Sequence, residues 1–147
     1  MSTKGNKELV RQVIKDRNEF AGDAAKVRSW CEKYCAPGYI HHNLARGDMN
    51  QEQMMQYFVE LMSAFPDFHK SIDDMVAEGD KVVLRYTIEG THKGTFAGIP
   101  ATGKHVSIKG NEIYKIEGRK ILEWWDFADY LGLMTQLGVV SGAAPKT

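Results

Sequence analysis

Three titratable side chains in this chain could perform chemistry, because each interrupts a row of apolar residues: His92, Glu112 and Asp126. A carboxyl group among apolar neighbours loses solvation when it ionises, so its pKa rises. An acid whose pKa lies near neutral pH suits proton transfer. The sequence therefore predicts acid/base catalysis, with Asp126 as the catalytic candidate and His92 and Glu112 as supporting catalytic groups.

Asp126 ends a predicted strand within the segment Lys120–Gly138. Side chains of a strand alternate between two faces, so Leu122 and Trp124 are expected on the face of Asp126. The opposite face is expected to carry Ile121, Glu123, Trp125 and Phe127. The structural alternative is that Asp126 lies half in water at the strand end, where it caps or pairs with a neighbour.

Glu112 is the hardest of the three to explain as a structural residue, because a carboxylate in an apolar row needs a partner. Lys109 and Lys115 occupy odd positions of the same strand and face the other way. For His92 the alternative is a structural hydrogen bond. Since hairpin-connected strands are neighbours, we expect Glu112, Asp126 and His92 to converge on one pocket.

The elements that position these residues change character at Pro66. Before it, apolar residues recur at helical spacing; after it, they alternate with period two. Glycine-containing turns at 78–80 and 117–119 separate the later strands. Helices are expected at 7–20, 24–35, 50–65 and 129–140, and strands at 68–78, 81–91, 104–116 and 120–128, with 39–43 as a strand or extended turn.

The order of these elements predicts an α+β fold in which N-terminal helices pack on the concave side of a curved antiparallel or mixed sheet. Such a fold leaves a pocket lined by a few polar side chains. His41, from the segment after the second helix, is a further candidate for this pocket. The glycine- and proline-rich loop Gly94–Gly103 is long enough to be functional, and the sequence leaves open whether it closes over the pocket.

Composition restricts the partners. The 147 residues are 43% hydrophobic and 26% charged with zero formal net charge, which fits one domain over 1–147 with a flexible tail from about residue 141. Lysine and arginine form no runs, so neither nucleic acid nor an anionic membrane is expected as a partner. Neither a signal peptide nor a membrane span is recognisable, so a cytoplasmic location is expected.

Cys31 and Cys35 are too few for a disulfide framework. Followed by His41 and His42, they could form a zinc site of the pattern Cys-x3-Cys-x5-His-His. The alternative is that the cysteines belong to a packed helix face with Trp30 and Tyr34. We favour the packed face and expect no metal site.

Two stretches carry a family resemblance: GTHKGTFAGIPATGK at 90–104 and IEGRKILEWWDFADYLGLMTQLG at 116–138. Together they resemble the SnoaL-like polyketide cyclases, a branch of the cone-shaped NTF2-like group, and the likeness covers nearly the whole chain. The resemblance implies an NTF2-like cone, a pocket without a cofactor, and commonly a homodimer formed through the outer face of the sheet.

In these cyclases the aspartate that matches Asp126 is the general acid/base of an intramolecular aldol closure. The position that matches His92 is also histidine, which favours a lining or hydrogen-bonding role for His92. Where the cyclases have a histidine, this chain has Glu112, so two acids would face each other across adjacent strands. Two like charges at short range favour a shared proton and one raised pKa.

The resemblance thus implies a cofactor-free enzyme that abstracts a proton α to a carbonyl and cyclises or isomerises a small hydrophobic substrate. An isomerase of the ketosteroid type or an epoxide hydrolase on the same cone remains open, as do a binding module without chemistry and a unit that only dimerises. The expected substrate-binding residues are His41, Tyr86, Tyr114, Trp124, Phe58, Met62 and Phe96.

Overall fold

Three amphipathic helices form most of the N-terminal half of the computed structural model, which describes residues 2–140. They are α1 (Thr3–Arg17), α2 (Ala24–Tyr34) and α3 (Gln51–Ala64). Each begins at a polar side chain that accepts backbone N–H groups of the first turn: Ser2, Asp23 and Asn50. The predicted flexible tail from residue 141 lies outside the described residues.

Six strands are present within residues 2–140. Five lie at predicted positions, and the short strand at 47–49 was not predicted. The six strands are β1 (Cys35–Asn43), β2 (Gly47–Met49), β3 (His69–Glu78), β4 (Lys81–Thr91), β5 (His105–Glu117) and β6 (Lys120–Ala128). The first strand begins already at Cys35, directly after α2, rather than at Tyr39 as predicted. The last helix, α4 (Tyr130–Gln136), is shorter than the predicted 129–140.

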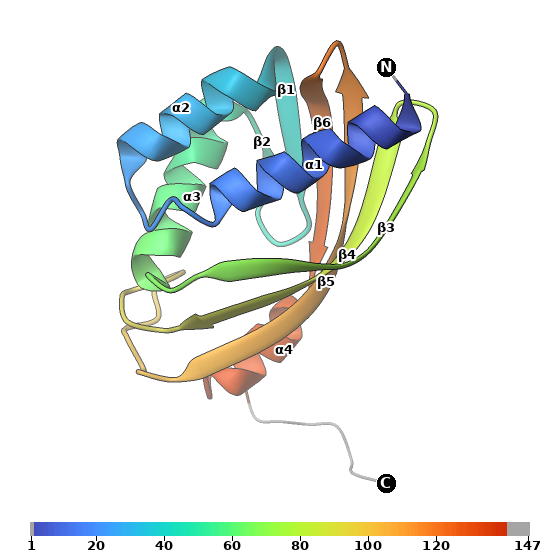
Figure 1. Ribbon diagram of the computed structural model, residues 1–147. Helices are drawn as coiled ribbons and strands as arrows, with labels where there is room; N and C mark the ends of the chain where they lie inside the picture. The colour runs from blue at the N-terminus through green and yellow to red at the C-terminus, as the bar shows by residue number, and fades with distance from the viewer. Residues whose placement is uncertain (1, 141–147) are drawn as a thin grey trace, which may run out of the picture.

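The strands form one open, mixed sheet in the order β2-β1-β6-β5-β4-β3. The pair β1–β6 is parallel and the other pairs are antiparallel. Figure 1 shows the sheet curving around the helices, with α1 lying across it and α2 and α3 on the same side. The predicted α+β class and the placement of the helices on the concave side are therefore confirmed.

One face assignment is wrong. Ile121, predicted to share a face with Trp125, is fully buried on the inner side. The pairing of β5 with β6 shifts between Lys115 and Ile116, where Ile116 pairs with Ile121 but Lys115 pairs with Glu123. Leu122 is thus an extra residue, and such a bulge reverses the alternation on one side of it. Beyond the bulge, Trp124 and Asp126 face inward as predicted.

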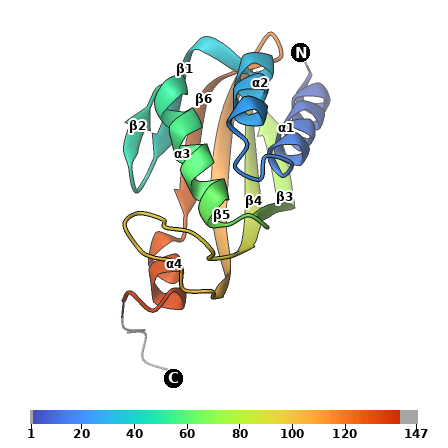
Figure 2. The ribbon, with the colours of Figure 1, turned by 90° about the vertical axis from the view of Figure 1, so that its left-hand side faces the viewer.

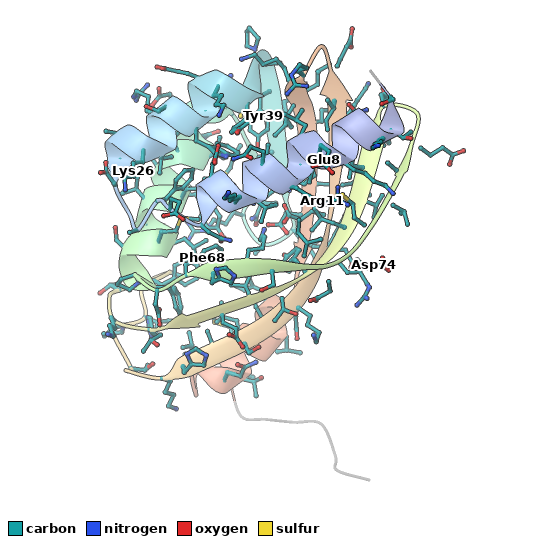
Figure 3. All side chains as sticks on the ribbon, in the orientation of Figure 1. Glu8, Arg11, Lys26, Tyr39, Phe68 and Asp74 are labelled. Atoms are coloured by element: carbon teal, nitrogen blue, oxygen red, sulfur yellow. The ribbon has the colours of Figure 1, made fainter. Side chains whose placement is uncertain are left out.

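The core lies between the helices and the inner face of the sheet. Tyr39 and Phe68 are buried in it, whereas Lys26 and Asp74 lie at the periphery of the molecule, as the labels of Figure 3 show. No helix within residues 2–140 combines the length and hydropathy that a bilayer crossing demands.

One end of the concave side is closed by α4 and by the loop between β4 and β5, which lie next to each other in Figure 2. The side-chain amide of Gln136 accepts from the backbone N–H of Ser107 at 2.8 Å and donates to its carbonyl at 2.9 Å. It thereby occupies the edge of β5 as a neighbouring strand would. This contact holds α4 over the end of the cavity.

Candidate active site

Asp126 faces a cavity between α3 and the inner face of the sheet. The hollow contains about 660 Å³ of space that no atom fills, including a part open to solvent, and its walls are mostly apolar. The Asp126 side chain is 12% exposed. The structural alternative, in which Asp126 lies half in water at the strand end, does not fit this position.

The carboxylate of Asp126 is held by a tyrosine from two strands away. Tyr86 on β4 donates a hydrogen bond from its hydroxyl to Oδ1 of Asp126 on β6, at 2.7 Å. Gly110, which pairs with Tyr86, lies on the intervening strand β5. A Cβ atom at Gly110 would lie 2.3 Å from the Tyr86 hydroxyl oxygen. The missing side chain therefore makes room for the tyrosine to cross β5.

Glu112 is the cross-strand partner of Asp126, as predicted, but it has cations of its own. Its Oε1 bonds Lys70 Nζ, and its Oε2 accepts from the Tyr114 hydroxyl at 2.6 Å. Arg17 Nη1 lies 3.6 Å from the same oxygen. The side chains of Glu112, Lys70 and Arg17 are at most 3% exposed.

These neighbours separate the pKa values of the two acids. Burial acts to raise the pKa of Glu112, but Lys70 and Arg17 hold it below its usual value. Burial and then the Glu112 charge raise the pKa of Asp126 to about 6, while Lys70 and the Tyr86 hydroxyl act against this rise. The expected sharing of one proton thus becomes a division of roles, with Glu112 ionised and Asp126 the group that titrates.

His41 lies beside Asp126 without bonding it. Its Nε2 is 4.0 Å from Asp126 Oδ2, beyond hydrogen-bond distance, and neither ring nitrogen has a hydrogen-bond partner among the described residues. The ring stacks on Trp124 with centroids 3.9 Å apart and planes 2° apart. Burial lowers the pKa of His41 to about 3, so the imidazole is neutral at physiological pH.

His92 does not join the two carboxylates. It lies just beyond the end of β4, whereas Glu112 pairs with Leu84 near the start of that strand. At about 3.3 Å per residue, roughly 25 Å of strand separates the two positions. Its Nδ1 accepts from the backbone N–H of Thr102 at 3.2 Å, and its ring stacks on Phe65. His92 therefore fixes the loop after β4. It does not reach the two acids, because β4 is too long for its end to lie beside them.

The apolar walls come from α3, the sheet, the loop and α4. Of the seven expected substrate-binding residues, four line the cavity: Phe58, Met62, Phe96 and Trp124. Phe96 is fully buried, so the Gly94–Gly103 loop contributes a wall of the cavity. The other three do not line it: Tyr86 and Tyr114 are hydrogen-bonded to Asp126 and Glu112, and His41 stacks on Trp124.

Sequence reasoning missed the two cations in the cavity wall, Lys70 and Arg17. Arg17 is the last residue of α1 and lies on its buried apolar face. Lys70 stands at an inward position of β3, between the buried Phe68 and the half-buried Ile72. For both residues, the signal in the sequence was a charged side chain at a position where the pattern expects an apolar one. The same signal identified Glu112.

The alternative zinc site is not assembled. Cys31 and Cys35 are buried free cysteines, and the neighbouring positions His41 and His42 face opposite sides of β1. His42 contacts Asp48 and Glu123 on the outer side. Within residues 2–140 there is no group of three or more His, Cys, Asp or Glu side chains arranged to hold a metal ion.

Comparisons with known proteins agree in one family. A family model described as SnoaL-like polyketide cyclase matches residues 12–137. The aklanonic acid methyl ester cyclase DnrD of Streptomyces peucetius is 30% identical over 134 residues, covering 89% of either chain.

Solved structures share the fold of this chain. TsrD of Streptomyces laurentii has a TM-score of 0.76 and 32% identity, over 95% of this chain and 99% of that one. AclR of Streptomyces galilaeus, a proposed hydroxylase, has a TM-score of 0.82 and 25% identity over the same shares.

Replacement of Gly110 by alanine should displace Tyr86 from Asp126. The new Cβ would overlap the ring, so we expect a loss of about 1–3 kcal/mol in the free energy of unfolding, as for overpacked cores. Loss of the Tyr86 hydrogen bond should also raise the pKa of Asp126 further, measured by NMR titration. Gly38→Ala is the control, because a Cβ at Gly38 meets nothing within 4 Å. Equal stability and an unchanged Asp126 pKa in Gly110→Ala would contradict this role.

Asp126→Asn should stabilise the protein above pH 6. With a pKa of about 6 when folded and about 3.9 when unfolded, Asp126 binds more protons in the folded state between these values, so stability falls as pH rises through this window. Asp126→Asn does not lose stability in this way. Its free energy of unfolding should exceed that of wild type by near zero at pH 4 and by on the order of 2–3 kcal/mol at pH 8.

Urea unfolding at both pH values measures this difference, with Asp80→Asn in the β3–β4 turn as the control. An advantage of Asp126→Asn that is absent, or that does not change with pH, would show that the carboxyl group is not desolvated.

Proposed function

Because this chain belongs to the SnoaL-like polyketide cyclase family, we propose that it is a cofactor-independent cyclase that closes a ring by an intramolecular aldol reaction. The observation that carries the proposal is Asp126, a buried carboxylate with a pKa of about 6 at the wall of an apolar cavity. A small hydrophobic carbonyl compound is the substrate class that fits such walls.

Asp126 acts twice in the proposed reaction. Its carboxylate takes a proton from a carbon next to a carbonyl group, which leaves an enolate. The enolate carbon forms a bond to a second carbonyl carbon of the same molecule, and the resulting alkoxide takes the proton back from Asp126. A pKa close to neutrality suits both transfers, because the group can accept a proton and release it again.

The remaining polar residues position this base. Tyr86 fixes the carboxylate through Oδ1, and Glu112 raises its pKa by charge repulsion. His41, neutral and stacked on Trp124, leaves Asp126 as the titrating group on this side of the cavity. His92 acts indirectly in this proposal, through the loop that carries Phe96.

The apolar walls supply orientation. Phe58, Met62, Phe96 and Trp124 surround the cavity with flat or adaptable side chains. They hold a folded substrate with its two carbonyl groups close together, which converts ring closure into a reaction of preassembled groups. An isomerase would use the same first step but would return the proton to another carbon.

We further propose a cytoplasmic homodimer that forms through the outer face of the sheet. This face carries a row of apolar side chains across four strands: Ile40, Trp125, Phe127, Ile113 and Val83. Ile40 and Phe127 are 40% and 43% exposed. A contiguous apolar row of this kind favours a protein interface over free solvent.

Asp126→Asn should abolish turnover. With aklanonic acid methyl ester, the compound in the relatives' names, we expect a rate at least about 10²-fold below wild type, because the amide cannot accept the proton. Product is followed by chromatographic retention, since ring closure does not change mass. The control Asp80→Asn should keep wild-type activity. Turnover by Asp126→Asn at the wild-type rate would refute Asp126 as the catalytic base. If the wild-type protein binds the compound without converting it, the protein is a ligand-binding module.

Ile113→Lys should convert the dimer to a monomer, because a lysine at the centre of the outer row would be buried in the interface without a partner. Analytical ultracentrifugation measures the mass. Leu131→Lys on α4, where Leu131 is 67% exposed, is the control that should leave the dimer intact. A monomeric wild type, or a dimer that tolerates Ile113→Lys, would contradict this interface.

A further inference from the structure

Two buried cations lie in the cavity wall, and the reaction described above uses them only to keep Glu112 ionised. Lys70 and Arg17 both line the cavity, and their side chains are 3% and 1% exposed. Desolvating a cation is costly, so a protein keeps one inside only where an anion or a dipole compensates it. Glu112 is one such anion, so a second negative charge is needed to balance both cations.

Backbone and ring contacts fix the two cations side by side. Asn18, which follows Arg17 at the end of α1, donates to the carbonyl of Lys70 at 2.9 Å and accepts from its N–H at 2.8 Å. The Arg17 guanidinium stacks 4.3 Å from the centre of the Trp124 ring, and Lys70 Nζ lies 4.1 Å from that of Tyr86. The helix end and the edge strand are therefore joined at this point.

Both cations keep unused capacity to donate. Arg17 donates from Nη2 to the Tyr114 hydroxyl at 2.8 Å, but its Nε and Nη1 have no hydrogen-bond acceptor among the described residues. Within residues 2–140, Lys70 Nζ donates a hydrogen bond to one acceptor, Glu112. An ammonium group has three donors. The wall thus contains buried N–H groups that lack oxygen partners.

The charges balance in only one state of Asp126. Lys70 and Arg17 carry two positive charges, and Glu112 and ionised Asp126 carry two negative charges. When Asp126 takes a proton, the cluster is left with one positive charge in excess. An anion that enters the cavity or forms in it at that moment restores neutrality.

We propose that Lys70 and Arg17 form an oxyanion site, which receives the negatively charged oxygen of the substrate when Asp126 removes the proton. This inference rests on the proposed function and names its substrate class: compounds with an acidic proton next to a carbonyl, such as 1,3-dicarbonyls, whose enolate oxygen binds the two cations.

The electron movements follow from this assignment. The proton moves from the substrate carbon to Asp126, the electrons of the C–H bond form the C=C bond of the enolate, and the carbonyl π electrons move to oxygen. Negative charge thereby leaves Asp126 and appears on the substrate oxygen near Lys70 and Arg17. The total charge of the four side chains and the substrate oxygen together stays at zero. Charges that are already in place before the reaction stabilise such a step strongly.

A phenol tests this site without turnover. Asp126→Asn lacks the base and resembles the protonated state of Asp126, and 2-naphthol ionises to an oxyanion with its own absorbance spectrum. We expect Asp126→Asn to bind 2-naphthol and to lower its pKa. Addition of Lys70→Met should reduce the ionised fraction of bound naphthol about tenfold or more at a given pH, because a nearby cation is lost.

Matched variants separate this effect from damage to the fold. Asp126→Asn with Lys109→Met removes a lysine from the outer face, 75% exposed, and should bind naphthol as Asp126→Asn does. A variant that adds Arg17→Met and Glu112→Gln to Asp126→Asn and Lys70→Met removes every charge of the cluster and keeps the proposal testable if Lys70→Met alone unfolds the chain. It too should bind naphthol mainly as the neutral phenol.

Two results would overturn the proposal: an equal ionised fraction with and without Lys70, or no naphthol binding by Asp126→Asn. Both are distinct from failure of the proposed function, which would appear as turnover by Asp126→Asn.

Discussion

The ion pair between Glu112 and Lys70 is the interaction on which the polar half of this molecule depends. A carboxylate with no solvent exposure is unfavourable by itself, and only cations and hydroxyl donors at contact distance make it tolerable. Lys70, Arg17 and Tyr114 provide these contacts from β3, α1 and β5. Because Glu112 is stabilised as an anion, the neighbouring carboxyl group of Asp126 is the one whose proton can move.

The absence of a side chain matters as much as the presence of charges. At Gly110 the sheet leaves space for the ring of Tyr86 to lie across β5. Tyr86 thereby connects β4 to β6 through a single hydrogen bond to Asp126. Glycine weakens a strand interior, so its occurrence there indicates a close approach of another group. Here that group is Tyr86, which orients the carboxylate of Asp126.

Trp124 contacts both the polar cluster and the apolar cavity. His41 stacks on one part of its ring system, Tyr114 stacks on it with centroids 5.5 Å apart, and the Arg17 guanidinium lies over it. The indole therefore packs against the polar cluster and also lines the cavity. A flat aromatic residue at this position keeps water from the ion pairs and offers an apolar surface to a ligand.

Alternation and helical spacing are local properties of the chain, so the residues predict most of the elements and the faces of most side chains, although not the short strand β2. The sequence also placed Asp126 and Glu112 on one inner face, since a hairpin makes their strands neighbours. Only the tertiary structure supplied Lys70, which is 42 residues from Glu112, and separated His92 from both acids. The physical reason is that a buried charge selects its partner by distance in space, and the curvature and length of strands decide that distance.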